Sequence, residues 1–127
     1  MTQSKLQMPR LWFTLAYALV LGVGVLSLIP GPDIGSSDKF VHFLTYAVLS
    51  AGFSLIVEHR KSLWLVLFGL IAYGFLLEFL QGLTSYRFKD MADALANSLG
   101  VITGLVFYFT PFHGIFRRLE RWLMFRW

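Results

Sequence analysis

The chain of 127 residues contains no cysteine. A disulfide, a thiolate nucleophile and a metal site built on cysteine are therefore excluded. Charged residues are also scarce, at 14% of the chain against about 25% in soluble proteins, whereas 57% of the residues are hydrophobic. This balance is typical of a membrane protein, and the length permits one small domain.

Four long apolar runs make up most of the chain. A helix crosses the hydrocarbon with about 20 residues, and about 17 suffice, so each run predicts one transmembrane helix. The first run is longer than the apolar core of a signal peptide, about 7–15 residues, so we expect it to be retained. The prediction is an all-α, integral membrane bundle of four transmembrane helices, a single domain over residues 1–127. The expected helices cover about residues 11–29, 40–57, 63–83 and 91–109.

Lysine and arginine are distributed unevenly among the segments that flank these runs. The two ends and the second-to-third loop carry Lys5, Arg10, Arg60, Lys61, Arg117, Arg118, Arg121 and Arg126. The other two loops carry Lys39, Arg87 and Lys89. Because cytoplasmic segments are enriched in basic residues, we expect both termini in the cytoplasm. The net charge of +4 is then a topology signal, and we expect no nucleic-acid partner.

The C-terminal tail, residues 112–127, has a pattern of its own. Its apolar residues recur at helical spacing: Ile115, Phe116, Leu119, Trp122 and Leu123. Three arginines of the same segment, Arg117, Arg118 and Arg121, lie away from that stripe. The pattern predicts a basic amphipathic helix at the inner membrane surface. It serves either as an anchor or as a docking element for another membrane protein.

Polar side chains interrupt three of the runs at one depth. His42 lies just inside the second run, and Asp93 and Asn97 lie near the start of the fourth. Glu78 lies roughly 7–8 Å before the end of the third at 1.5 Å per residue. A charge in mid-membrane costs about 2.5–3.5 kcal/mol and usually faces an interior or a wet cavity. We therefore expect an outward-facing polar pocket between the second, third and fourth helices.

The fourth run also has a stripe of polar and small residues on one helical face. It comprises Asp90, Asp93, Asn97, Gly100 and Gly104. The last two form a G-x-x-x-G pair, which allows close helix approach, and Ala47 and Ala51 offer a similar surface on the second run. Asn97 is therefore interpreted first as a hydrogen bond between helices.

Acidic residues inside a membrane are functional by default, so a functional role is favoured for Glu78 and Asp93. With His42 they are the candidate catalytic residues, as general acid or base. A metal site of these three is conceivable, but the chain has no H-E-x-x-H pattern and no close ligand pair containing histidine. We expect no metal and no cofactor.

Three segments together resemble the VanZ-like membrane family. The first is Ser37 to Phe43, SDKFVHF, with Tyr46. The second is Glu78-x-x-Gln81, and the third joins Arg87, Asp90, Asp93, Asn97, Gly100 and Gly104 at their spacing. The resemblance covers about residues 30–106. It implies a small multi-pass protein of the bacterial inner membrane, in a family whose named member is associated with low-level resistance to the glycopeptide teicoplanin. The site residues it implies are Asp38, Lys39, His42, Glu78, Gln81, Arg87, Asp90, Asp93 and Asn97.

These observations lead to three hypotheses about function. The first is a cell-envelope protein whose pocket binds an anionic lipid, a lipid-linked wall precursor or a lipoglycopeptide, with Lys39 and Arg87 meeting phosphate or carboxylate. The second is a membrane-embedded hydrolase or transferase acting on a lipid head group. The third is a structural or partner-binding protein. The expected partners are membrane lipids and, beyond them, a second copy of the chain or another membrane protein.

Overall fold

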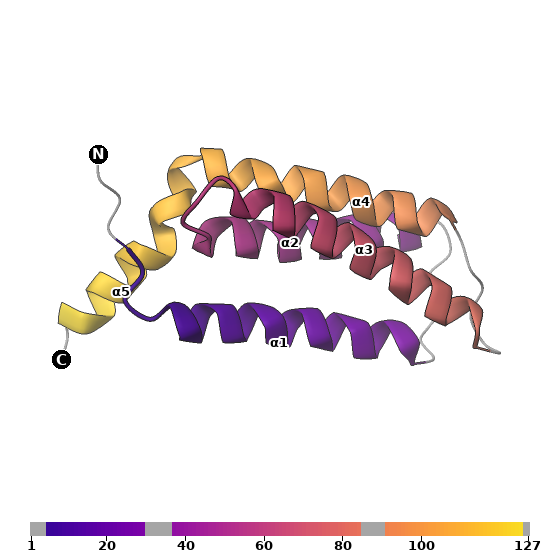
Figure 1. Ribbon diagram of the computed structural model, residues 1–127. Helices are drawn as coiled ribbons and strands as arrows, with labels where there is room; N and C mark the ends of the chain where they lie inside the picture. The colour runs from indigo at the N-terminus through magenta and orange to yellow at the C-terminus, as the bar shows by residue number, and fades with distance from the viewer. Residues whose placement is uncertain (1–4, 30–36, 85–90, 126–127) are drawn as a thin grey trace.

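The computed structural model describes residues 5–29, 37–84 and 91–125 of the chain, the side chains of residues 37, 38 and 125 excepted (Figure 1). Five α-helices occur there: α1 (Pro9–Leu28), α2 (Ser37–Ile56), α3 (Ser62–Gly82), α4 (Met91–Leu105) and α5 (Ile115–Phe125). Two short 3-10 helices, η1 (Val106–Phe109) and η2 (Pro111–Gly114), join α4 to α5.

The first four helices match the four predicted spans. The described residues contain four helices that are long and apolar enough to cross a membrane, the last of them running from Met91 to Phe109 through η1. Pro9 stands at the first position of α1, where its missing N–H is no loss. The last predicted span differs in detail, since its final turn tightens into η1 before Thr110 adopts an extended conformation ahead of Pro111.

The helices run alternately up and down, so that α2 and α4 are parallel to each other (Figure 1). These two helices approach most closely where α4 has glycine. A Cβ added at Gly100 would collide with the carbonyl oxygen of Phe43, and one at Gly104 would collide with the carbonyl oxygen of Ala47. The hydroxyl of Ser50 donates to the carbonyl oxygen of Val101 across this seam, at 2.6 Å. The close contact predicted from the G-x-x-x-G pair and the two alanines is confirmed.

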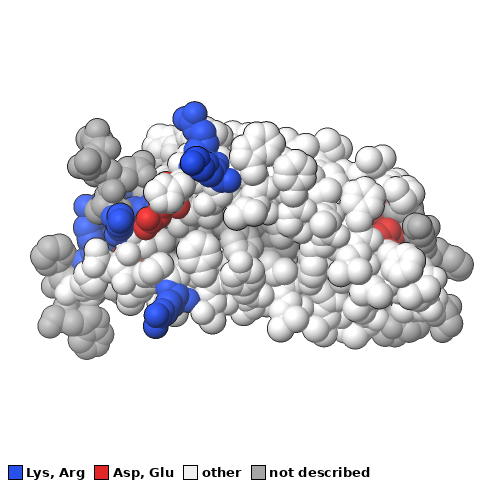
Figure 2. All heavy atoms as spheres, in the orientation of Figure 1, with Lys and Arg blue, Asp and Glu red and all other residues white. Residues whose placement is uncertain are grey.

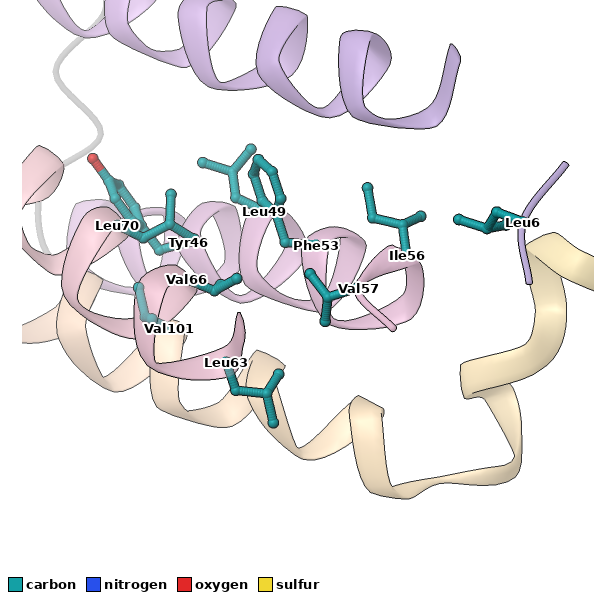
Figure 3. Packing of buried hydrophobic residues seen from close by; sticks show 10 residues of the cluster. All are labelled: Leu6, Tyr46, Leu49, Phe53, Ile56, Val57, Leu63, Val66, Leu70 and Val101. Carbon is teal, nitrogen blue, oxygen red and sulfur yellow. The ribbon is translucent and has the colours of Figure 1, made fainter. Parts of the chain in front are cut away.

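The apolar core is formed mainly by α2 and α3, with Val101 of α4 and half-buried residues of α1 packed against it. Figure 3 shows Leu49 and Phe53 projecting from α2 toward α1, and Leu63, Val66 and Leu70 projecting from α3. Val101 of α4 is fully buried. The outward faces of the helices carry many exposed large apolar residues, as expected for side chains that contact lipid.

Helix α1 lies to one side of the other three and is mostly exposed (Figure 1). Two polar contacts attach it to α3. The Tyr73 hydroxyl donates to the carbonyl oxygen of Val20 at 2.7 Å, and the Gln81 amide donates to that of Ser27 at 2.7 Å. Gly24 leaves the space that the Tyr73 ring occupies, since a Cβ there would collide with its hydroxyl.

The opposite end of α1 is bonded to α5 through a buried carboxylate. Glu120 is fully buried and accepts hydrogen bonds from the backbone N–H groups of Gln7 and Met8, at 2.7 and 2.9 Å. It also accepts one from the Trp12 indole at 2.5 Å. Burial by itself raises the pKa of Glu120, but these donors and the charge of Arg117 together hold that pKa below its ordinary value.

Helix α5 forms where the sequence predicted it. Ile115, Leu119 and Trp122 of the predicted apolar stripe are exposed, whereas Phe116 of the same stripe packs against the Trp12 ring. Arg117, however, is buried, and it donates to the carbonyl oxygen of His113 at 2.9 Å. The face opposite the stripe packs against the chain itself, because Glu120 supplies a buried counter-charge for that arginine.

Candidate functional site

Four polar residues meet where α2 and α4 begin, at the end of the bundle away from α5. Lys39 and His42 share one face of α2, and Asp93 and Asn97 share one face of α4. We call these four residues the polar cluster. The Lys39 ammonium lies 2.5 Å from Oδ1 of Asp93, and Nδ1 of His42 lies 3.0 Å from Oδ1 of Asn97. The parallel pairing of α2 and α4 makes this meeting possible, because parallel helices begin at the same end.

His42 lies between an amide and a carboxylate. An amide oxygen only accepts hydrogen bonds. In this arrangement Nδ1 of His42 therefore carries the proton and donates a hydrogen bond to Oδ1 of Asn97. The other ring nitrogen, Nε2, lies 3.7 Å from Oδ2 of Asp93.

The members of the polar cluster differ in how far their side chains are exposed. The Lys39 side chain is 42% exposed, whereas that of Asp93 is 10% exposed and that of His42 is 15% exposed. Asn97 is buried. The cluster therefore opens to the surroundings through Lys39, and Asp93 is the anion that an incoming group would have to replace.

Helix α3 contributes Glu78 and a glycine to the same region. Glu78 is 2% exposed and interacts electrostatically with the Tyr46 side chain of α2. A Cβ at Gly74 would lie 3.3 Å from the Asn97 amide nitrogen and 3.4 Å from the Tyr46 ring, so this glycine lets both side chains pack against α3. The Tyr46 hydroxyl is buried and has no hydrogen-bond partner among the described residues.

Gln81 takes a different position from the rest of the predicted set. It is buried, as expected, but its amide donates to Ser27 of α1 and so lies on the side of α3 that faces that helix. Arg87 and Asp90 lie outside the described residues, as does the side chain of Asp38. Among the described residues, the structure thus brings together Lys39, His42, Asp93 and Asn97, with Glu78 nearby on α3.

The chemistry of this region is that of acids, an amide, an imidazole and one ammonium group. Within residues 5–29, 37–84 and 91–125, no three histidine or acidic side chains are grouped so as to hold a metal ion. An apolar cavity of about 330 Å³ lies elsewhere, between α1, α2 and α3.

Two features of the structure were not predicted. One is the role of Gly74, whose only signal in the sequence is its place one turn before Glu78. The other is the buried pair of Glu120 and Arg117. Its signal is that Glu120 is the single acid in an otherwise basic tail.

One of three comparisons with known proteins found a match. The searches of curated proteins and of solved structures returned no match. The family model described as VanZ/LLP1 matches residues 4–117, which includes the four spanning helices and the polar cluster. A match over nearly the whole chain identifies this multi-pass membrane protein as a member of the VanZ/LLP1 family.

Proposed function

We propose that the polar cluster binds the anionic head group of a lipid-anchored molecule in the cell envelope. The observation that carries the proposal is the ion pair of Lys39 with Asp93, in which the cation is half-exposed and the anion is nearly buried. A phosphate or carboxylate that approaches from the membrane surface meets Lys39 first. It then competes with Asp93 for the ammonium group.

The neighbouring groups support the same activity. His42 donates to Asn97 through Nδ1 and turns Nε2 toward Asp93, so the imidazole lies beside the position that an anion would take on displacing Asp93. The Tyr46 hydroxyl, buried without a partner among the described residues, supplies a further donor beside Glu78. A buried unsatisfied hydroxyl calls for a water molecule or a ligand atom, and this one lies next to the cluster.

The orientation of the protein is part of the proposal. We infer a bacterial inner membrane with both termini in the cytoplasm, so the polar cluster faces outward. The support is the distribution of basic residues: Figure 2 shows lysine and arginine gathered toward the end that carries α5. The ligand is then an anionic phospholipid, a lipid-linked wall precursor or a lipoglycopeptide such as teicoplanin, which share an acidic group and a lipid tail.

The proposal is tested with two substitutions that have opposite expected effects. Lys39→Ala removes the cation and should weaken binding of the anionic ligand about tenfold, a loss of about 1.4 kcal/mol. Asp93→Asn removes the competitor for Lys39 and should strengthen binding. Arg121→Ala is the charge-matched control, because this exposed arginine lies on α5 at the other end of the molecule.

The measurement is native mass spectrometry of the purified protein with three probes in turn. The probes are phosphatidylglycerol, a polyprenyl diphosphate-linked wall precursor and teicoplanin. The probe whose affinity falls with Lys39→Ala and rises with Asp93→Asn belongs to the ligand class. If all three probes bind equally to the wild type, to Lys39→Ala and to Arg121→Ala, the cluster has only a structural role.

A second candidate function is chemistry on a lipid head group, as a hydrolase or transferase. The approach of Nε2 of His42 to within 3.7 Å of Asp93 favours it, because an imidazole paired with a carboxylate is suited to acid–base catalysis. Glu78 is the third group available for proton transfer. Release of the head group by purified protein, abolished by His42→Gln with the fold retained, would establish this function. Binding without turnover would leave the first proposal in place.

A further inference from the structure

A cavity of about 330 Å³ lies in the half of the bundle that adjoins α5. It is bounded by the first half of α1, the end of α2 and the first half of α3, so it is distinct from the polar cluster at the other end. Its lining is almost entirely apolar, and Phe13, Phe53, Leu65 and Val66 contribute to it. The volume falls within the range of about 300–1,000 Å³ that is typical of small-molecule pockets.

The length of the cavity corresponds to one leaflet of a bilayer. Along α3 its lining begins at Ser62 and ends at Tyr73, a rise of about 16 Å at 1.5 Å per residue. Half of a hydrocarbon core of about 30 Å is about 15 Å. The hydrogen bond from the Tyr73 hydroxyl to Val20 joins α1 to α3 at that depth. An acyl chain of the same leaflet has the matching length and the matching chemistry.

Basic residues flank the surface end of the cavity. On α1, Arg10 lies one turn before the lining residue Phe13 and on the same face. On α3, Lys61 immediately precedes the lining residue Ser62. Both basic residues are exposed, and they lie toward the end of the molecule where Figure 2 shows the basic side chains gathered. A phosphate on an acyl chain in the cavity would lie at this level.

We propose that the cavity binds one acyl chain of an anionic phospholipid from the leaflet on the α5 side, with its phosphate held by Arg10 and Lys61. The lipid fills the space that the lining residues of α1, α2 and α3 leave open. This inference is independent of the proposed function, because it concerns a different lipid-accessible site in the opposite leaflet.

Gly69 provides a direct test of occupancy. It lines the cavity, and a Cβ placed there would meet no atom within 4 Å. Gly69→Leu should therefore fold normally and fill the space meant for the chain. Gly22→Leu is the matched control, since Gly22 also has open space around its Cβ but does not line the cavity. Both variants introduce the same side chain into a spanning helix.

The protein is purified in detergent, incubated with phosphatidylglycerol and examined by native mass spectrometry. We expect the occupancy of the most tightly retained lipid to fall at least tenfold in Gly69→Leu and to remain at the wild-type level in Gly22→Leu. Equal retention by both variants would overturn the proposal. Loss of a dimer in Gly69→Leu without loss of lipid would also overturn it, because the occupant would then be a second copy of the chain.

The head-group part is tested separately with phosphatidylglycerol and phosphatidylcholine offered in equal amounts. The double variant Arg10→Gln, Lys61→Gln should lose the preference for phosphatidylglycerol while it retains the same number of phospholipids. A preference that persists in this variant would refute the assignment of the phosphate to these two residues. Lys39→Ala should leave this site unaffected, so the outcome here does not depend on the polar cluster.

Discussion

The glycine seam between α2 and α4 makes a demanding prediction about Gly104. A Cβ at this position would lie 2.6 Å from Cβ of Ser50 and 2.7 Å from the backbone nitrogen of Ala51, where ordinary contact is 3.4–4 Å. Two of the atoms that Gly104→Ala would strike belong to the backbone of α2, so a change of rotamer does not relieve the overlap. The shortest contact is to the carbonyl oxygen of Ala47 and must reach at least 3.4 Å, so the two helices must separate by about 1 Å in a close-packed interior.

The cost of that separation follows from what the seam holds. Overpacking of this kind costs about 1–3 kcal/mol. The hydrogen bond from Ser50 to Val101, 2.6 Å long, crosses the same contact and would lengthen. We expect Gly104→Ala to lower the free energy of unfolding by about 1–3 kcal/mol. The measurement is unfolding with sodium dodecyl sulfate in mixed micelles, followed by circular dichroism.

The control for this prediction carries the opposite sign. Gly52 lies on α2, and a Cβ added there would have no atom within 4 Å, so Gly52→Ala meets no obstacle. Alanine is favoured over glycine in a helix by up to about 1 kcal/mol, and Gly52→Ala should stabilise the protein by a part of that. Equal stability of the two variants would refute the reasoning, because it would mean that α2 and α4 do not meet at Gly104.

Three further predictions use the same unfolding measurement. Tyr73→Phe removes a hydrogen bond between α3 and α1 and should cost about 0.6 kcal/mol, with an effect above about 1.7 kcal/mol arguing for a larger role. Asn97→Ala removes the contact with His42 and should cost a similar amount; an unchanged free energy of unfolding would contradict that contact. Glu120→Gln should lower stability by about 1.5–3 kcal/mol at neutral pH. Because the folded-state pKa of Glu120 is depressed, its stabilisation is full above the ordinary value of 4.5 and is lost as the pH falls through the folded pKa. The curves of wild type and Glu120→Gln should therefore converge in acid, and parallel curves would show that Glu120 is not charged in the folded protein.

The sequence predicts the spanning helices and the polar cluster well, for related reasons. A bilayer accepts only helices or closed barrels, so long apolar runs have one interpretation. Polar residues inside those runs must turn away from lipid, so the stripe of Asp93, Asn97 and Gly100 marks the face of α4 that meets α2. Lys39 and His42 lie at the matching depth, and the antiparallel order of the helices then brings both pairs to the same end.

The position of α1 is the part that the sequence does not reveal. In a membrane, an apolar side chain gains little from facing protein instead of lipid, so an apolar run gives no indication of its packing face. Helix α1 is such a run, without a charge between Leu11 and Ile29. Its hydrogen bonds to α3 are made by backbone carbonyl oxygens that accept from Tyr73 and Gln81, and a backbone carbonyl leaves no sequence signature. The destination of Gln81 could not be predicted for that reason.

The connection between α1 and α5 shows why helical amphipathicity alone is an incomplete guide to the tail. The backbone N–H groups of Gln7 and Met8, just before α1 begins, both donate to Glu120 of α5. The carboxylate therefore lies near the positive end of the α1 dipole. Once that carboxylate is buried, a nearby cation is required, and Arg117 lies one turn before it. The tail therefore has a second face, which packs against the start of α1 and which its amphipathic pattern does not reveal.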